Sequence, residues 1–319
     1  MGLPILTVNR QKCAGFILWV ALFVLSIASI FLYLKIEPFV TYYFIFAWWS
    51  SIFILDSWLY LRGGETLFYD KTIETFTFLI PFSAFLWFGF EAFNLRLQNW
   101  SYQGLPPVLW IRWLGYFISY STVLPALFVV SNGLDQYNIF RKNEFSGFFN
   151  QSFSRFSIFF LILFGLFVLI LSLCFPRYFY FFIWVGFIFL LDPIHSFLGE
   201  KSLFQEWKQR NWNRTFQLLL AGCICGFFWE FWNFWAGAKW QYHLSWPSFI
   251  ENIKIFEMPL LGFLGFPIFA LECFVLTIFA QLLRKKLSRA GWQILCLFCF
   301  IFSLFMCYGI DQNTVISFR

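Results

Sequence analysis

Nine long apolar segments make up most of this chain of 319 residues. They lie near residues 14–35, 39–61, 73–93, 108–131, 156–175, 178–198, 215–235, 257–282 and 292–310. An α-helix needs about 20 apolar residues to cross the hydrocarbon core of a bilayer. A helix also satisfies the backbone hydrogen bonds that lipid cannot provide. We therefore predict an all-α fold, a polytopic transmembrane helical bundle of about nine spans.

The composition excludes the soluble classes of protein. Hydrophobic residues make up 61% of the chain and charged residues only 12%, whereas a soluble domain carries about 25% charged residues. A disordered chain, a nucleic-acid-binding protein and a secreted disulfide scaffold all need more polar surface than this sequence offers. We therefore expect membrane lipid as a partner and a hydrophobic small molecule as a candidate ligand, with no nucleic acid. The oligomeric state is left open.

The distribution of basic residues predicts the orientation. Fifteen of the 22 Lys and Arg residues fall on the side of the membrane where the amino terminus lies. Cytoplasmic loops retain positive charge, so we predict a cytoplasmic amino terminus and an external carboxyl terminus, in a bacterial inner membrane. The first apolar run follows Arg10 and Lys12 and lacks a small-residue cleavage site, which predicts an uncleaved anchor.

Polar motifs recur along the chain in the same order. The sequence around Asp56 recurs around Asp192, 136 residues later. The pattern Glu-x-x-Asn, followed by Trp-x-Tyr, occurs twice: Glu91, Asn94, Trp100 and Tyr102, then Glu230, Asn233, Trp240 and Tyr242. Aromatic matches arise by chance in such a sequence, so the acidic and amide residues carry the argument. We predict two four-span repeats of the same orientation, 1–135 and 136–283, and an additional span in 284–319.

Ionisable residues at bilayer depth mark candidate sites, because burying an unpaired charge is costly. An outer layer contains Glu91, Glu230 and Glu257, which are the candidate catalytic residues. Asn94 and Asn233 lie three residues after the first two glutamates, on the same helical face, and are candidate substrate-binding residues. A deeper layer adds three further candidates for substrate binding: Asp56, Asp192 and Glu272. The alternative is that these acids form buried pairs that only stabilise packing.

The two loops with Trp100 and Tyr102, and with Trp240 and Tyr242, have two interpretations. Trp and Tyr are enriched at every membrane interface, which explains the residue types. The same pairs could instead line a cavity between the two halves that binds a long apolar or polyene molecule. No known metal or cofactor motif is present, and we expect neither. The two histidines, His195 and His243, fall on opposite sides of the membrane and cannot ligate one haem together.

Part of the second half resembles a known family. Glu230-Phe-Trp-Asn233, the pair Trp240-x-Tyr242 and the stretch Phe256-Glu257-Met258-Pro259 are together similar to the pattern of the lycopene cyclase domain. That resemblance implies an isoprenoid substrate. The stretch from Phe256 to Phe263 also resembles an uncharacterised family of bacterial polytopic membrane proteins, which brings no function.

Two functional hypotheses follow. The first is an enzyme that acts on an isoprenoid or long-chain lipid, with Glu91, Glu230 and Glu257 as acids or bases in an aromatic cavity open to the outer leaflet. The second is a transporter or a non-catalytic subunit of a membrane complex. A closed outer pocket favours the enzyme, a path between the two acidic layers favours transport, and acids all paired with Arg or Lys favour a scaffold.

Overall fold

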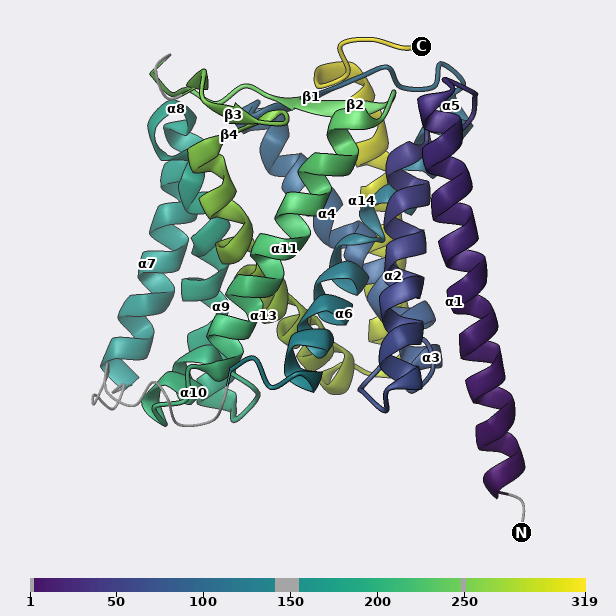
Figure 1. Ribbon diagram of the computed structural model, residues 1–319. Coiled ribbons are helices and arrows are strands. Elements are labelled where there is room, and N and C mark those ends of the chain that lie inside the picture. The colour runs from purple at the N-terminus through teal and green to yellow at the C-terminus, as the bar shows by residue number, and fades with distance from the viewer. Residues whose placement is uncertain (1–2, 141–154, 248–250) are drawn as a thin grey trace.

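The computed structural model describes residues 3–140, 155–247 and 251–319. Within these residues, nine helical stretches are long and apolar enough to cross a membrane. They stand side by side as a bundle, with the two chain termini at opposite ends (Figure 1). The structure thus confirms the predicted helical bundle and its nine spans, and the protein is an integral membrane protein.

The first four spans contain seven helices. Their bounds are α1 (Leu3–Tyr33), α2 (Tyr43–Leu61), α3 (Thr72–Glu74), the π-helix η1 (Thr75–Leu79), α4 (Ile80–Leu97), α5 (Leu109–Tyr120) and α6 (Val123–Gln136). The third span combines α3, η1 and α4, and the fourth combines α5 and α6.

The remaining five spans follow. Their bounds are α7 (Arg155–Cys174), α8 (Pro176–Phe179), the 3₁₀ helix η2 (Tyr180–Phe182), α9 (Ile183–Leu198), α10 (Leu203–Lys208), α11 (Asn213–Trp235), the 3₁₀ helix η3 (Leu260–Leu264), α13 (Gly265–Lys286) and α14 (Arg289–Asn313). The core lies among α4, α6, α11 and α13, whereas α1 and α7 flank the bundle against α2 and α9 (Figure 1).

The fourth span is broken, although the sequence predicts one continuous segment. Helix α5 ends at Tyr120 and α6 begins at Val123. Pro125 explains the break, because proline has no N–H to donate and its ring clashes with the carbonyl four residues earlier. Ser83 of α4 bridges the break: its hydroxyl donates to the Tyr120 carbonyl at 2.7 Å and accepts from the Leu124 N–H at 3.0 Å. The freed backbone groups are thereby satisfied inside the membrane.

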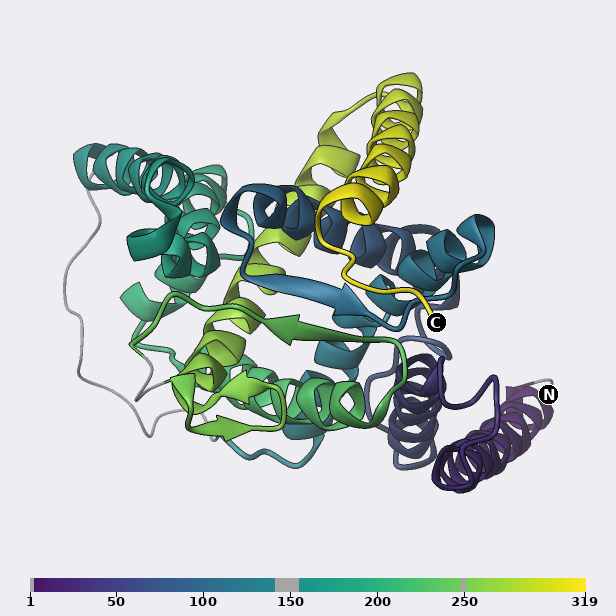
Figure 2. The same ribbon diagram turned by 90° about the horizontal axis from the view of Figure 1, so that it is seen from above.

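A short β-ribbon lies across one end of the bundle (Figure 2). Strand β1 (Trp100–Gln103) pairs antiparallel with β2 (Lys239–Tyr242), and a second pair joins β3 (Lys254–Ile255) to β4 (Met258–Pro259). The segment after α14 lies alongside β1, with bridges from Tyr102 to Val315 and from Leu105 to Phe318. We call the end that carries β1 and β2 the ribbon end. The sequence did not predict this ribbon, because its strands are only four residues long.

Candidate functional site

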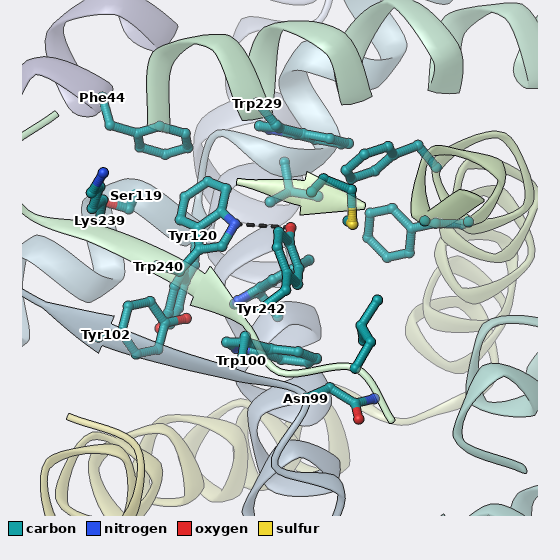
Figure 3. Close-up of a pocket in the computed structure, with 18 of the residues that line it drawn as sticks. Phe44, Asn99, Trp100, Tyr102, Ser119, Tyr120, Trp229, Lys239, Trp240 and Tyr242 are labelled. Atoms are coloured by element: carbon teal, nitrogen blue, oxygen red, sulfur yellow. Dashed lines mark hydrogen bonds between the residues drawn. The ribbon is translucent and has the colours of Figure 1, made fainter. Parts of the chain in front are cut away.

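A cavity of about 330 Å³ lies beneath the β1–β2 ribbon. Its walls come from both halves of the chain, including α2, α5, α9, α11 and α13. Aromatic side chains dominate the lining (Figure 3). All four predicted aromatic residues of the loops line it: Trp100, Tyr102, Trp240 and Tyr242. These four residues therefore face a cavity that is formed by both halves of the chain.

Glu91 lies behind one wall of the cavity and is fully buried. Its Oε1 accepts hydrogen bonds from Trp87 Nε1 at 2.9 Å, from Trp100 Nε1 at 3.0 Å, and from the hydroxyl of Tyr102. The hydroxyl of Tyr120 lies 3.4 Å away and donates to the same oxygen. Its Oε2 has no hydrogen-bond partner among the described residues. All the donors to Glu91 therefore converge on one oxygen, and each belongs to a residue that lines the cavity.

Glu230 occupies a similar place behind the other wall, also fully buried. Its Oε1 accepts from the hydroxyl of Tyr242 at 2.8 Å. That hydroxyl in turn accepts from Trp240 Nε1 at 2.8 Å (Figure 3). Its Oε2 has no hydrogen-bond partner in the described parts of the chain. Both glutamates therefore reach the cavity through a tyrosine of the ribbon and do not line it themselves.

Within the described ranges, neither Glu91 nor Glu230 forms an ion pair. Two other acids near the cavity do. Asp311 pairs with Arg112 at 2.7 Å, and Glu257 pairs with Lys239. Among the described residues, Glu91 and Glu230 thus differ from Asp311 and Glu257 in being held by hydrogen-bond donors alone.

Tyr102 and Tyr242 lie in the ribbon, outside the spans, and both phenols are weaker acids than usual. Burial raises the pKa of Tyr102 and Tyr242 well above the usual value, and the negative charge of Glu91 or Glu230 raises each pKa further. Both phenols therefore stay protonated over the physiological range and act as hydrogen-bond donors.

Asn94 and Asn233 hold the ribbon to the helix ends. The Asn94 side chain donates to the Trp100 carbonyl at 2.9 Å and accepts from the backbone N–H groups of Asn99 and Trp100. Asn233 exchanges two bonds of 2.9 Å with the backbone of Trp240. Neither asparagine lines the cavity. Their amides are used by the backbone, so they position the aromatic residues.

The remaining predicted acids, Glu257 and Glu272, do not line the cavity either. Glu257 is held by Lys239 at the ribbon end and does not line the cavity. Glu272 is fully buried on α13, where Oε1 accepts from the Phe187 N–H at 3.3 Å.

Asp56 and Asp192 cap loops at the opposite end of the bundle. The two oxygens of Asp56 accept from the N–H groups of Leu67 and Phe68, at 2.8 and 2.9 Å. Those of Asp192 accept from Leu203 and Phe204, at 3.0 and 2.8 Å. His195 lies near Asp192, with 3.9 Å between Nδ1 and Oδ1. The deeper acidic layer thus consists of loop caps and the separate Glu272.

The sequence did not indicate several of the residues that line the cavity. Trp87 could have been found, since it precedes Glu91 by four residues and therefore shares its helical face. Tyr116, Tyr120, Trp184, Trp229 and Phe269 also line the cavity, but nothing distinguishes them from the many other aromatic residues of the spans.

A second cavity of about 250 Å³ lies near the opposite end, between η1 and α6 of the first half and α11 and α13 of the second. Its lining is more polar. The charged residues that line it are Glu65, Lys71, Glu74, Asp135, Lys201 and Arg214. Lys71 pairs with Glu65, and Arg214 with Glu206.

No protein-family model, curated protein or solved structure matches the chain. Function is therefore inferred from the cavities and from the groups in their walls.

Proposed function

We propose that this protein is a membrane enzyme that acts on an isoprenoid or other long-chain lipid in the ribbon-end cavity. One observation carries the proposal: two ribbon tyrosines, Tyr102 and Tyr242, line an aromatic cavity, and each hydroxyl donates to a buried glutamate that has no cation partner among the described residues. An aromatic cavity with a few convergent polar groups is the usual form of a small-molecule site.

The two tyrosine–glutamate pairs suit acid–base chemistry on an apolar chain. In such a reaction a proton is added at one carbon and lost from another, so the substrate is isomerised or cyclised without net gain or loss of atoms. The phenols contact the substrate, while Glu91 and Glu230 deliver or accept protons through them. Trp87, Trp229 and the other lining rings would stabilise the positive charge that develops on a polyene. The sequence resemblance to the lycopene cyclase domain also favours an isoprenoid.

We infer that the chain consists of two four-span repeats, 1–135 and 136–283, and an additional span in 284–319. Matching hydrogen bonds support the repeat. Asp56 caps the amides 11 and 12 residues after it, and Asp192 does the same. Asn94 and Asn233 both hold the backbone of a following tryptophan.

The register of the ribbon also supports the repeat. Trp100 pairs with Tyr242, Tyr102 with Trp240, and Ser101 with Gln241. Each repeat thus places its Trp opposite the Tyr of the other. A two-fold axis between Ser101 and Gln241 produces this arrangement, and an axis along the membrane normal is the symmetry expected of repeats with the same orientation.

We propose that the protein lies in a bacterial inner membrane with its amino terminus in the cytoplasm. The bias of Lys and Arg supports this orientation. The ribbon end, which carries the carboxyl terminus, then faces outward (Figure 1).

The enzyme proposal is tested by comparing lipid extracts of cells that produce the wild type or Glu230→Gln, at equal amounts of folded protein. We expect a lipid isomer in the wild-type extract that is missing from the variant. Mass spectrometry of lipids that co-purify with the variant should reveal the unreacted substrate. Identical extracts from wild-type, Glu230→Gln and empty-vector cells would refute the enzyme.

The second cavity favours one alternative, a transporter. Helix α6 contributes Val123 to the ribbon-end cavity and Phe128 to the second cavity, and between them Leu124 and Leu127 are fully buried. Two cavities separated by a thin apolar barrier, beside the break in the fourth span, resemble a closed translocation path. Lipid movement between leaflets of proteoliposomes, with unchanged lipid chemistry, would favour transport. A non-catalytic subunit would show neither activity and would co-purify with other proteins.

A further inference from the structure

We propose that the ribbon-end cavity is loaded sideways from the bilayer, through a portal between η2 and η3, and that it takes an uncharged lipid. The inference rests on the proposed lipid function of this cavity. It adds the route of access and the charge of the ligand.

Exposed apolar residues of the lining mark the portal. Phe181 of η2 is 48% exposed, and Leu261 and Leu264 of η3 are 48% and 65% exposed. All three line the cavity, and all three belong to membrane-spanning stretches. Their exposed surface therefore meets hydrocarbon, and the cavity opens toward lipid at this side.

The ribbon covers the cavity on the side that faces water, and its β1 strand is buried. Trp100 and Tyr102 of β1 are only 5% and 6% exposed. The segment after α14 covers the outer edge of β1, where the Tyr102 N–H donates to the Thr314 carbonyl at 2.8 Å and the Ile316 N–H donates to the Tyr102 carbonyl at 2.7 Å. A ligand that entered from the aqueous side past the β1 edge would have to break these bonds.

The charges in the lining are already neutralised. Among the described lining residues, only Arg112 and Lys239 carry charge. The guanidinium of Arg112 donates to both oxygens of Asp311 and to the carbonyls of Pro106 and Pro107. Lys239 is bound to Glu257. An anionic headgroup would compete with a carboxylate for one of these cations, which an uncharged ligand avoids.

The size of the cavity defines how the lipid binds. At about 330 Å³ it lies near the lower limit of small-molecule sites, which span roughly 300–1,000 Å³. It therefore holds one end of a long chain, and the remainder extends through the portal into the bilayer. Neutral donors in the wall, including Asn99 and Ser119, are available to a hydroxyl or carbonyl group at the bound end.

The test compares geranylgeraniol with geranylgeranyl phosphate, which share a chain and differ in charge. Binding of each to the full-length protein in nanodiscs is followed by association rate and by equilibrium occupancy. We expect the alcohol to bind at least about tenfold more tightly than the phosphate, a difference of about 1.4 kcal/mol. Equal affinities, or tighter binding of the phosphate, would overturn the uncharged ligand.

The portal is tested with Leu264→Trp, which should slow association of the alcohol several-fold. Leu260→Trp is the matched control, because Leu260 is also in η3 and 46% exposed but does not line the cavity. Leu264→Ala, which cannot block the portal, should associate at least as fast as the wild type. Equal rates for Leu264→Trp and Leu260→Trp would overturn the portal.

The results of these binding tests can be distinguished from the results of the test of the proposed enzyme activity. Portal-dependent binding of the alcohol with unchanged cell lipids would refute the enzyme and leave this inference standing. A lipid isomer in wild-type cells, together with equal association rates for Leu264→Trp and Leu260→Trp, would refute the portal and leave the enzyme standing. Absence of binding by both probes would overturn the lipid-loaded cavity itself.

Discussion

Trp100 lies directly opposite Tyr242 across the β1–β2 ribbon, although 142 positions separate them in the chain. Each residue also reaches a hydrogen-bond network on its own half. The indole of Trp100 donates to Glu91, and the hydroxyl of Tyr242 donates to Glu230. The ribbon therefore links the hydrogen-bond networks of the two buried glutamates. Changes to either network should have measurable effects.

Tyr242→Phe should destabilise the protein more than Tyr102→Phe. Tyr242 is the hydrogen-bond donor to Glu230 Oε1, whereas Glu91 retains Trp87 and Trp100 when Tyr102 is changed. Leaving a buried polar group unsatisfied costs about 1–3 kcal/mol. The measurement is the free energy of unfolding in detergent for both variants. A larger loss for Tyr102→Phe would contradict the assigned networks.

Stability should fall in alkaline solution. The pKa of Tyr102 and Tyr242 is raised in the folded protein by burial, so the unfolded chain loses these protons first, above a pH of about 10. The tyrosine contribution is complete below that pH and declines as pH rises. The unfolding midpoint should be followed between pH 8 and about 11. Tyr242→Phe should show a shallower decline, and an identical slope would argue against a buried phenol.

Arg112→Leu should destabilise the packing of α14 against the bundle and so lower the free energy of unfolding. The substitution leaves Asp311, whose side chain is 5% exposed, without its cation. Breaking a buried ion pair in this way costs about 3–5 kcal/mol. The double variant Arg112→Leu with Asp311→Leu removes both charges and should recover part of that loss. A double variant as unstable as the sum of the single ones would show that the pair is not coupled.

Gly222→Ala should destabilise the contact between α11 and α13. A Cβ at Gly222 would lie 2.5 Å from the Phe266 carbonyl oxygen, a backbone atom that cannot move independently. Gly89→Ala is the matched control, because a Cβ there meets nothing within 4 Å and alanine favours a helix by about 1 kcal/mol. Thermal unfolding in detergent should show a lower midpoint for Gly222→Ala alone. Equal midpoints would mean that the two helices are less close than the structure shows.

Asp56→Ala should loosen the loop that follows α2. It leaves the N–H groups of Leu67 and Phe68 without an acceptor. Hydrogen exchange at these two amides should accelerate, while the amides of β1 at the far end of the bundle stay protected. Asp192→Ala should produce the same local effect at Leu203 and Phe204. Unchanged exchange at Leu67 and Phe68 would contradict the capping role.

The sequence predicted the spans well because the hydrocarbon thickness imposes a length on every helix. Gly222 and Gly226 allow a close helix contact in the structure, where both lie against Phe266. Pro125 predicts that the fourth span could kink, but not that it is broken at Ser121 and Thr122. A proline such as Pro125 can bend or interrupt a helix, and the outcome depends on whether a neighbour such as Ser83 can satisfy the freed groups.

The candidate site was only partly predictable. The sequence selected Glu91 and Glu230 because acids are costly in lipid, and it selected the aromatic pairs because they recur beside those acids. It could not show that the tyrosines line the cavity while the glutamates lie behind them. Nor could it pair Glu257 with Lys239, which removes that acid from the cavity wall.

The sequence by itself predicted nine membrane spans, matched by nine apolar helical stretches in the described residues, and indicated that its few ionisable residues are the ones to examine. Only the tertiary structure decided which of those residues meet. Arg112 binds Asp311 across 199 positions of sequence, and Trp100 meets Tyr242 across the ribbon. Hydrophobic periodicity is a local property, since each span must suit lipid on its own. The cavity arises from long-range packing of two halves, which no local pattern specifies.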